Sequence, residues 1–420
     1  FGSSSAERPL QPAPGDPFGS PRWPGAAAFA GGKMADEDKP TELYPNISLG
    51  HKRHMLLSDQ CPNREKLQAE VLAIVKEKAM LPYYEKYLCP AAIGPADEAL
   101  KAEMKKKNDE DLAKLEERIT DAKENLGDIE VRDALLAKAQ FFNRIGDKEA
   151  AIQGYQEAFE KTVGIGGKLD NILTVIRIAL FFDDIPLVKK EIDRAKVELG
   201  KGGDWERRNK LKVYEGIYLM ISRNWKEAAT LFLNVMPTFT AVELVEFKDF
   251  VFYAVIMAMT ALDRPQIREK LVASPEVLSS IKETPHLQEF LESYFYCRYK
   301  SMMEHFVPII DAVKADRYLS RHCRHFMRIM RLNAYRQFLA SYRSVKLEAM
   351  ASEFGVSSAF IDAELASFIS SGKLTCKIDK VGESIESNES DNRSQVYVEI
   401  IKQGDLLLNR MQKLAGAIDM

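Results

Sequence analysis

The sequence predicts an all-α protein: a tetratricopeptide-like (TPR-like) helical solenoid, then a winged-helix module, then a C-terminal helix. Three observations predict this fold class. Helical periodicity runs nearly without a break from Asn63 to Ala340. Two K-E-A-A elements begin at Lys148 and Lys226, 78 residues apart (226 − 148), which is two units of 39 and a period typical of helical repeats. After Val345 the pattern changes to two short helices and a hairpin.

Composition limits the class of protein. The 420 residues, 46% of them hydrophobic, provide cores for two or three domains. The formal net charge of −3 gives no overall attraction to nucleic acid or to an anionic membrane surface. The longest apolar run, Phe250 to Leu262, has 13 residues, whereas a membrane span needs about 20. This run therefore predicts a buried core helix.

The cysteines indicate a reducing compartment. There are five, at Cys61, Cys89, Cys297, Cys323 and Cys376. Because they are far apart and never spaced as Cys-x-x-Cys, neither a disulfide framework nor a zinc ribbon is expected. No charged segment followed by an apolar one opens the chain, so no secretory signal is expected.

Residues 1–33 differ in composition from the rest of the chain. Their prolines alternate with Gly, Ala and Ser, and such a segment cannot bury enough apolar surface to become ordered. We expect a disordered leader that is not native, with Met34 as the natural start. Abundant native peptides from residues 1–33 in mass spectrometry would contradict this. A helical segment is expected over residues 34–128.

One long, charge-rich helix is predicted from Asp97 to Leu126 and ends at Gly127. Its sparse apolar residues form a thin stripe, namely Leu100, Met104, Leu112, Leu115, Ile119, Ala122 and Leu126. Such a helix lies across a solenoid, reaches toward another chain, or is simply solvated and supported by i,i+4 ion pairs.

The solenoid is predicted over residues 129–340 as stacked helix pairs. Helices over 133–145, 169–182 and 208–223 are each followed by a two-residue turn and a second helix; the turns are Gly146-Asp147, Asp183-Asp184 and Asn224-Trp225. Each pair buries its face by stacking on the next pair. Four more helices are expected at Val242–Leu262, Pro265–Ser274, His286–Lys314 and Asp316–Tyr342. Four prolines break or kink this region: Pro265, Pro275, Pro285 and Pro308.

A winged helix is predicted over residues 341–390. A short helix from Val345 ends at Gly355, and a second, the recognition helix, runs from the cap Ser357 to Gly372. Its buried face is expected to comprise Ile361, Leu365, Phe368 and Ile369. Two strands follow: Leu374 to Asp379, with Leu374, Cys376 and Ile378 facing inward, and Val381 to Ser387.

The charges of the recognition helix favour protein over DNA as the partner. It contains Asp362 and Glu364 but no Lys or Arg. DNA binding depends on cations that contact phosphates and base edges. We therefore expect this module to bind protein, with the strand Leu374 to Asp379 or its hairpin partner offering an open edge to a neighbour.

The last segment, residues 391–420, predicts a helix from Gln395 to about Ala417. Leu407, Met411, Leu414 and Ile418 recur at spacings of 4, 3 and 4, the pattern of a coiled-coil seam, and Leu408 and Ala415 widen it. A lone chain need not cover this seam, so it is a second expected partner surface.

No active site, metal site or cofactor site is indicated. His322 and His325 can share a metal at i and i+3, but no third ligand has suitable spacing, and a charged helix surface is the simpler interpretation. The run Gly164 to Lys168 lacks the spacing of a P-loop and lies between two helices. Nothing in the sequence assembles a nucleophile, a base and a pocket.

An arginine stripe is the one charged feature that points to a partner. Arg317, Arg321, Arg324, Arg328 and Arg331 are spaced 4, 3, 4 and 3, as on one helix face, opposite Leu319, Phe326, Ile329 and Met330. Such a stripe is solvated surface, a contact for an acidic protein, or a nucleic-acid contact. Arginine is enriched at interfaces, and the arginine-free recognition helix disfavours nucleic acid.

The order of solenoid, winged helix and terminal helix resembles the PCI family, whose members scaffold the proteasome lid, the signalosome and translation initiation factor three. Within the family the similarity is greatest to proteasome-lid members. The segments that carry it are M-L-P-Y-Y-E from Met80, A-K-E-N-L-G from Ala122, N-R-I-G-D-K-E-A from Asn143, G-G-D-W-E-R-R-N-K-L-K-V-Y-E-G from Gly202, C-K-I-D-K-V from Cys376 and K-Q-G-D-L-L-L-N-R-M-Q-K-L from Lys402.

The resemblance implies a non-catalytic lid scaffold, without cofactors, in the cytoplasm and nucleus. It implies contacts with other PCI subunits through the winged-helix edge and a bundle of terminal helices, and further contacts with the ATPase ring and the lid deubiquitinase. Neither nucleic acid nor membrane is an expected partner. Two alternatives remain: a PCI scaffold of the signalosome or of translation initiation factor three, and a winged-helix nucleic-acid-binding protein.

Overall fold

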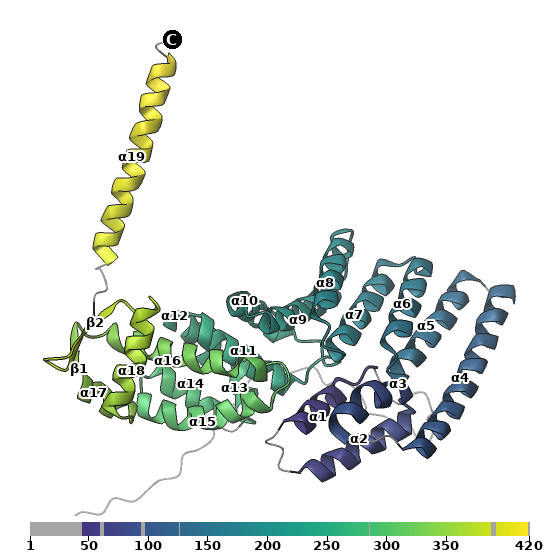
Figure 1. The fold of residues 1–420 in the computed structure, drawn as a ribbon. Coiled ribbons are helices and arrows are strands. Elements are labelled where there is room, and N and C mark those ends of the chain that lie inside the picture. Colours follow the sequence, from purple (N-terminus) through teal and green to yellow (C-terminus); the bar gives the residue numbers. More distant parts are fainter. Residues whose placement is uncertain are drawn as a thin grey trace, which may run out of the picture. The chain divides into compact units, whose positions relative to one another are not determined.

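The structure is a computed structural model that describes residues 44–58, 63–93, 97–125, 127–284, 286–387 and 392–418. The chain divides into residues 1–42 and residues 43–420. The expectations for the leader and for Met34, Cys61, Leu126 and Pro285 lie outside the described residues. The all-α prediction is confirmed, since helices dominate and the strands form one small sheet (Figure 1).

The first half of the described chain consists of helices in succession. Their bounds are α1 Ile47–Leu57, α2 Arg64–Lys78, α3 Leu81–Tyr83, the π-helical segment η1 Tyr84–Ile93, α4 Glu98–Asn125, α5 Asp128–Ile145, α6 Lys148–Lys161, α7 Ile165–Phe181, α8 Ile185–Gly200, α9 Trp205–Ile221, α10 Trp225–Val235 and the 3-10 turn η2 Met236–Thr238.

The second half adds shorter helices and the winged helix. The bounds are α11 Phe247–Ala261, α12 Arg264–Ile267, the π-helical segment η3 Arg268–Val272, α13 Pro275–Ile281, α14 Leu287–Phe295, α15 Tyr299–Ala315, the 3-10 turn η4 Ser320–His322, α16 Cys323–Leu339, β1 Ser344–Lys346, α17 Leu347–Phe354, α18 Ser358–Ser370, β2 Cys376–Asp379, β3 Ser384–Ser387 and α19 Asn392–Ile418.

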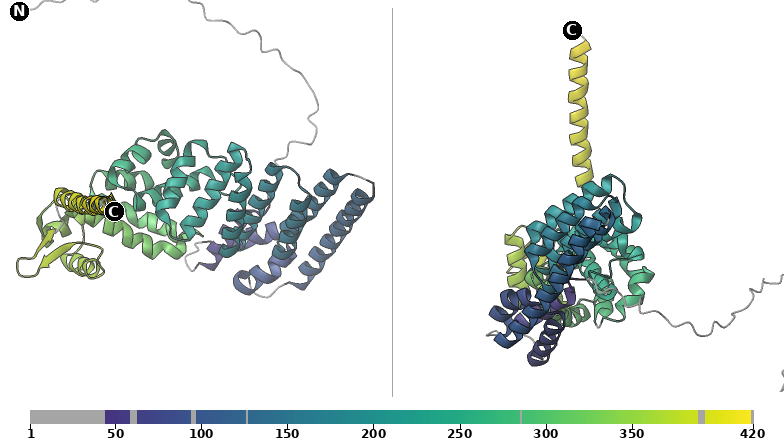
Figure 2. Two further views of the ribbon diagram at one scale, coloured as in Figure 1. Left: turned by 90° about the horizontal axis from the view of Figure 1, so that it is seen from above. Right: turned by 90° about the vertical axis from the view of Figure 1, so that its right-hand side faces the viewer.

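Consecutive helices from α4 to α11 pack on one another, as the solenoid prediction requires (Figure 1, Figure 2). The long helix α4 packs on α5, so it belongs to the stack, and Met104, Ile119 and Ala122 of its stripe are buried. One continuous apolar core joins α7 to the winged helix. The helix pairs therefore cannot bury their faces separately.

The two helices of each predicted pair are joined by the same backbone conformation. Gly146, Asp183 and Arg223 all adopt left-handed φ values, of 80°, 58° and 68°. The amide after each bonds back to a carbonyl five residues earlier, for example Asp184 N to Ala179 O at 2.9 Å. This left-handed ending closes one helix, and the next begins immediately. The turns were visible in the sequence because two of the three carry Gly or Asp.

Two of the four later helices were predicted wrongly. The segment His286–Lys314 is two helices, α14 and α15, because Cys297 adopts a left-handed φ of 60° between them. The segment Asp316–Tyr342 becomes α-helical only at Cys323. The carboxylate of Asp316 explains why the helix begins late, since it accepts hydrogen bonds from the amides of Tyr318 and Leu319 at 2.9 and 2.8 Å. Local bonds of this kind compete with helix formation.

The winged helix has the predicted helices and one strand more. The sheet order is β1-β3-β2, all antiparallel, and the fully buried Ile385 of the central strand lies opposite Val345 and Ile378. Val345 was expected to start a helix, but it lies in β1 and the helix begins at Leu347. Ser357 caps α18 as predicted, accepting the amide of Phe360. No division of the described chain falls at residues 128, 340 or 390, so those domain boundaries remain predictions.

Candidate protein-interaction surfaces

Helix α19 presents an apolar face that the rest of the described chain leaves uncovered. Of the predicted seam, Leu407, Met411 and Leu414 are 61%, 64% and 64% exposed, and Leu408 is 57% exposed. Ile418 closes the helix, but its side chain lies outside the described residues. Single exposed apolar residues are ordinary on protein surfaces, whereas a stripe along a whole helix marks an interaction site.

The exposed stripe of α19 begins earlier than the sequence analysis predicted. Val396, Ile400, Leu407, Met411 and Leu414 are spaced 4, 7, 4 and 3, so they share one helix face, and Tyr397, Ile401 and Leu408 form a second row beside it. Together these eight residues are called the α19 face. Gly404 interrupts the first row, which hid the continuity of the pattern.

The sheet offers its backbone rather than its side chains. Leu374 and Cys376 are buried and Ile378 is half-buried, so the predicted inward orientation is confirmed. These side chains hold the module together and are not available to a neighbour. Both β1 and β2 lie at edges of the sheet, because each pairs only with β3. An edge strand leaves unpaired amide and carbonyl groups for another chain.

The prediction that five arginines share one helix is wrong. Arg317 lies in the turn before α16 and is buried. Its Nη2 donates to Leu180 O at 3.0 Å, to Phe181 O at 2.7 Å and to Asp183 at 2.9 Å. This arginine therefore connects the turn before α16 to the end of α7, and its role is structural.

Two more arginines of the predicted stripe have partners inside the protein. Arg331 pairs with Glu364 of α18 at 2.7 Å. The Arg328 guanidinium lies 5.6 Å from the centre of the Phe368 ring, a cation–π contact. Only Arg321 and Arg324 are exposed without a partner among the described residues. The sequence spacing could not reveal this, since it says nothing of what faces the helix.

The acidic residues of the recognition helix α18 are also paired within the protein, although Oδ1 of Asp362 is buried without a hydrogen-bond partner among the described residues. Glu364 accepts a hydrogen bond from the Tyr335 hydroxyl at 2.7 Å in addition to its pair with Arg331, and Asp362 pairs with Lys380 at 2.6 Å. Burial, followed by the bond to Glu364, raises the pKa of Tyr335. The helix that would enter a DNA groove is thus tied to α16 by an ion pair and a hydrogen bond.

His322 is not part of a charged helix surface, contrary to expectation. It is buried, with Nε2 2.8 Å from Ile221 O and Nδ1 2.9 Å from Arg223 Nε. Because Arg223 must donate, Nδ1 accepts and Nε2 donates, which is the neutral ring. Burial, opposed by the bond to Ile221, lowers the pKa of His322 and favours this form. His325 instead stacks edge-on against Trp225 at 4.8 Å.

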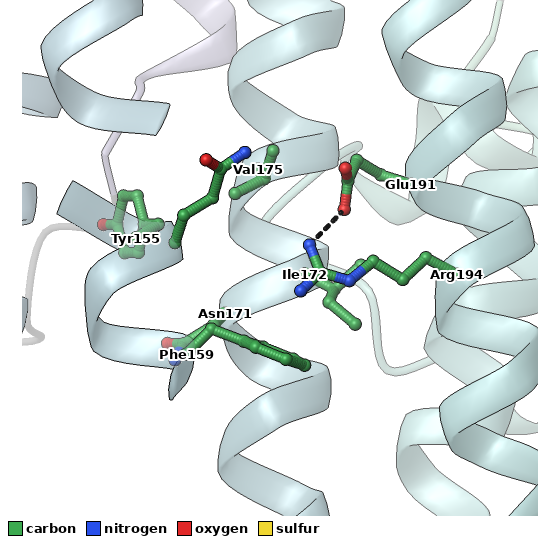
Figure 3. A pocket seen from close by; sticks show the side chains of 8 residues that line it. Tyr155, Phe159, Asn171, Ile172, Val175, Glu191 and Arg194 are labelled. Carbon is green, nitrogen blue, oxygen red and sulfur yellow. Dashed lines mark hydrogen bonds and ion pairs between the residues drawn. The ribbon is translucent and has the colours of Figure 1, made fainter. Parts of the chain in front are cut away.

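The described residues form no group of three or more His, Cys, Asp or Glu side chains that could hold a metal ion. A hollow between α6, α7 and α8 is lined by Tyr155, Phe159, Glu191 and Arg194 (Figure 3), and its volume of about 10 Å³ admits about one water molecule. The prediction that the run Gly164 to Lys168 is an inter-helix loop is wrong, because only Gly164 precedes α7 and residues 165–168 form its first turn. Across the described ranges, no helix is both long and apolar enough to cross a bilayer.

The described chain is a stack of helix pairs that ends in a winged helix. The outer strands of the winged helix each have an unpaired edge and the terminal helix is exposed, which together define a PCI-type scaffold. The PCI domain model matches residues 309–389, and the models for "26S proteasome subunit RPN7" and "26S proteasome regulatory subunit RPN7/PSMD6 C-terminal helix" match residues 97–270 and 397–418. The chain belongs to this proteasome subunit family, the RPN7/PSMD6 family.

Relatives from distant organisms support the assignment. The chain is 47% identical over 391 residues to 26S proteasome non-ATPase regulatory subunit 6 of Oryza sativa subsp. japonica, covering 93% of this chain and 100% of that protein. It is 34% identical over 409 residues to 26S proteasome regulatory subunit RPN7 of Saccharomyces cerevisiae, covering 91% and 95%. COP9 signalosome complex subunit 1 of Arabidopsis thaliana is more distant, at 22% identity over 198 residues, 47% of this chain and 45% of that protein.

Proposed function

We propose that this chain is a non-catalytic scaffold subunit of the lid of the 26S proteasome regulatory particle. It supports assembly of the particle and thereby the ATP-dependent degradation of ubiquitinated proteins. The observation that carries the proposal is the α19 face, whose side chains are all more than half exposed along the helix. Family membership supplies the kind of partner: the relatives are named as proteasome regulatory subunits.

The α19 face binds the terminal helices of other lid subunits in a bundle. Burying one Leu side chain contributes about 1.5–3 kcal/mol, so a handful of these side chains suffices for stable association. The two rows of the face are consistent with a helix that has neighbours on more than one side, as in a bundle.

The winged-helix edge provides the second contact. The outer strands β1 and β2 each have one side without a partner strand in the described chain. A neighbouring PCI subunit adds to this edge through main-chain hydrogen bonds. The ion pair of Arg331 with Glu364 fixes the module against α16, so the edge is presented at a defined angle.

The critical experiment places a charge in the α19 face. Leu407→Asp buries an unpaired carboxylate in any bundle and should weaken lid incorporation at least tenfold, since such a charge costs several kcal/mol. Asn409→Asp is the matched control, because residue 409 lies two positions from Leu407 on the opposite side of the helix. Native gels of assembled lid provide the readout.

Deleting residues 395–420 should leave a folded monomer that does not enter the lid. Normal incorporation of the deletion, or equal effects of Leu407→Asp and Asn409→Asp, would contradict the proposal. A folded monomer is expected because the continuous core from α7 to the winged helix contains no residue of α19.

Three further parts of the proposal rest on the family. The chain performs no catalysis, which is supported by its membership in a family of proteasome regulatory subunits. It contacts the ATPase ring and the lid deubiquitinase, and it occurs in cytoplasm and nucleus. Affinity purification tests the contacts: ATPase subunits should co-purify, whereas ribosomal partners would indicate an initiation-factor scaffold.

A further inference from the structure

A second, charged site lies on the solenoid, at the turn between α9 and α10. A cavity of about 400 Å³ opens there between this turn, the end of α11 and α16. Three basic side chains line it, Arg223, Lys226 and His325, together with the apolar Trp225 and Ile329 and one acid, Glu227. We call this cavity the α10 pocket. Its volume lies in the usual range for ligand sites.

The α10 pocket differs from the equivalent turns in its charge. At the two preceding turns an aspartate caps the next helix: Asp147 accepts the amide of Ala150 at 3.5 Å, and Asp184 accepts the amide of Leu187 at 3.2 Å. At the third turn the cap residue is Asn224, whose side chain makes no capping bond. The first amides of α10 therefore have no capping side chain, although the carboxylate of Glu227 lies in the first turn of the helix.

The basic residues of the pocket also lack the acids that their counterparts have. Lys148, the first residue of α6, pairs with Asp184 at 2.5 Å. Lys226 holds the same place in the K-E-A-A element of α10, yet no ion pair joins it to an acid in the described part of the chain. Arg223 stands where the preceding turn has Asp183. The third turn thus reverses the charge of the second.

Arg223 is exposed to solvent, but one edge of its guanidinium is anchored by a hydrogen bond. Its Nε donates to Nδ1 of the buried His322, which in turn donates to Ile221 O. This bond uses one edge of the guanidinium and leaves both terminal nitrogens without a partner among the described residues. A planar donor fork fixed in this way is suited to an oxyanion.

No compensating acid acts on the other side of the pocket. Burial lowers the pKa of His325, and the charged neighbours that lower it further are Arg223, Lys373, His322 and Arg328, all of them bases. Glu227 is the single carboxylate in the lining. The lowered pKa favours the neutral ring of His325, so the charged side chains of the pocket are two cations, Arg223 and Lys226, and one carboxylate. These two cations, and not the helix end alone, define the site.

We propose that the α10 pocket binds a phosphate monoester group. Such a group carries nearly two negative charges and three acceptor oxygens, which match the Arg223 fork, the Lys226 ammonium and the open amides of α10. A carboxylate offers two oxygens and one charge, and so leaves part of this donor set unused. Trp225, Ala261 and Ile329 form an apolar wall for the molecule that carries the phosphate. The group comes from a phosphoserine or phosphothreonine of a protein, or from a soluble inositol phosphate.

The full chain tests the proposal through the fluorescence of Trp225. The sequence has two further tryptophans, Trp23 and Trp205, of which Trp205 is 60% exposed, so a Trp23→Phe, Trp205→Phe background leaves Trp225 as the one fluorescent indole. The probes are inorganic phosphate, inositol hexakisphosphate, and an array of phosphoserine peptides with their unphosphorylated copies, at constant ionic strength. We expect a saturable response to phosphate. Tighter binding of phosphopeptides than of their copies assigns a protein source, and preference for inositol hexakisphosphate assigns a soluble one. No saturation, or the same response to chloride, overturns the proposal.

Variants distinguish the site from general attraction to a basic surface. Asn224→Asp restores the capping carboxylate of the other turns, so it should keep the fold and weaken phosphate binding at least tenfold. Lys226→Gln should weaken binding about fivefold, and Glu227→Gln should strengthen it. Lys190→Gln, an exposed lysine of α8 outside the pocket, is the control and should change nothing. Undiminished binding by Asn224→Asp would contradict the assignment.

Discussion

Replacing Arg317 tests the contact between the end of α7 and the turn before α16. Arg317 is 6% exposed, and its Nη2 bonds the Leu180 and Phe181 carbonyls and Asp183. Replacing it by Met keeps much of the side-chain volume but removes all three bonds. The perturbation therefore separates a structural arginine from the surface arginine that the sequence spacing predicted.

The magnitude follows from the contacts. Each bond from a cation to a buried carbonyl is worth about 1.5–3 kcal/mol when its partner is left unsatisfied. The ion pair adds less than about 1 kcal/mol, because Asp183 is 41% exposed. Releasing the guanidinium from burial offsets part of the loss, since its Nη1 has no hydrogen-bond partner. The net loss is about 3 kcal/mol, equivalent to about a hundredfold change in an opening equilibrium.

Hydrogen exchange measures this loss locally. Amides at the end of α7 and in α1 should exchange about a hundredfold faster in Arg317→Met than in the unaltered chain. Arg324→Met is the control, because Arg324 is exposed and has no partner among the described residues, and it should stay within about 0.5 kcal/mol. Equal exchange in the two variants would refute the structural role of Arg317.

Three further predictions concern neighbouring contacts. Gly50→Ala should speed proteolysis of α1 severalfold, because the added Cβ collides with the Arg317 guanidinium; an unchanged cleavage rate would refute the contact. Burial lowers the pKa of His51 from 6.5, so the unfolded chain binds the proton first, and docking of α1 should be intact above about pH 6.5 and weaken as pH falls further. Exchange in α1 at pH 7.5 and 5.5 checks this, and His51→Gln should reduce the difference. Glu364→Gln should cost about 1–2 kcal/mol in thermal unfolding by weakening the Arg331 and Tyr335 bonds, whereas the exposed Glu386→Gln should cost under about 0.5.

The helix pairs could be predicted because their signals are local. The alanine-rich K-E-A-A elements indicate the helices, and turns such as Gly146-Asp147 indicate where they end. The break at Cys297 could not be seen, since nothing in Tyr296-Cys297-Arg298 favours a left-handed residue; tertiary packing imposes it. Strand β1 was missed for a similar reason. Its three residues are too few for a period, and they are extended because β3 pairs with them.

The interaction surfaces divide in the same way. The part of the α19 face from Leu407 to Leu414 could be predicted from spacing alone, whereas Gly404 hid its continuation toward Val396. The arginines were not, since the partners of Arg317 lie more than 130 positions away in sequence. The signal for the α10 pocket was present in the sequence as the change from Asp184 to Asn224 at equivalent turns. Asp184 and Asn224 can be compared only once the structure shows that the residues before them, Asp183 and Arg223, share a left-handed φ.

The chemical uniformity of the α19 face has a thermal consequence. Its side chains are aliphatic apart from the thioether of Met411 and the aromatic ring of Tyr397, and Tyr397 contributes the only hydroxyl among the eight. Association driven by such groups releases ordered solvent, so it strengthens on warming from the cold and in sulfate-type salts. A complex held through this helix should therefore loosen on ice and tighten near 37 °C, opposite to the behaviour of contacts built from paired charges.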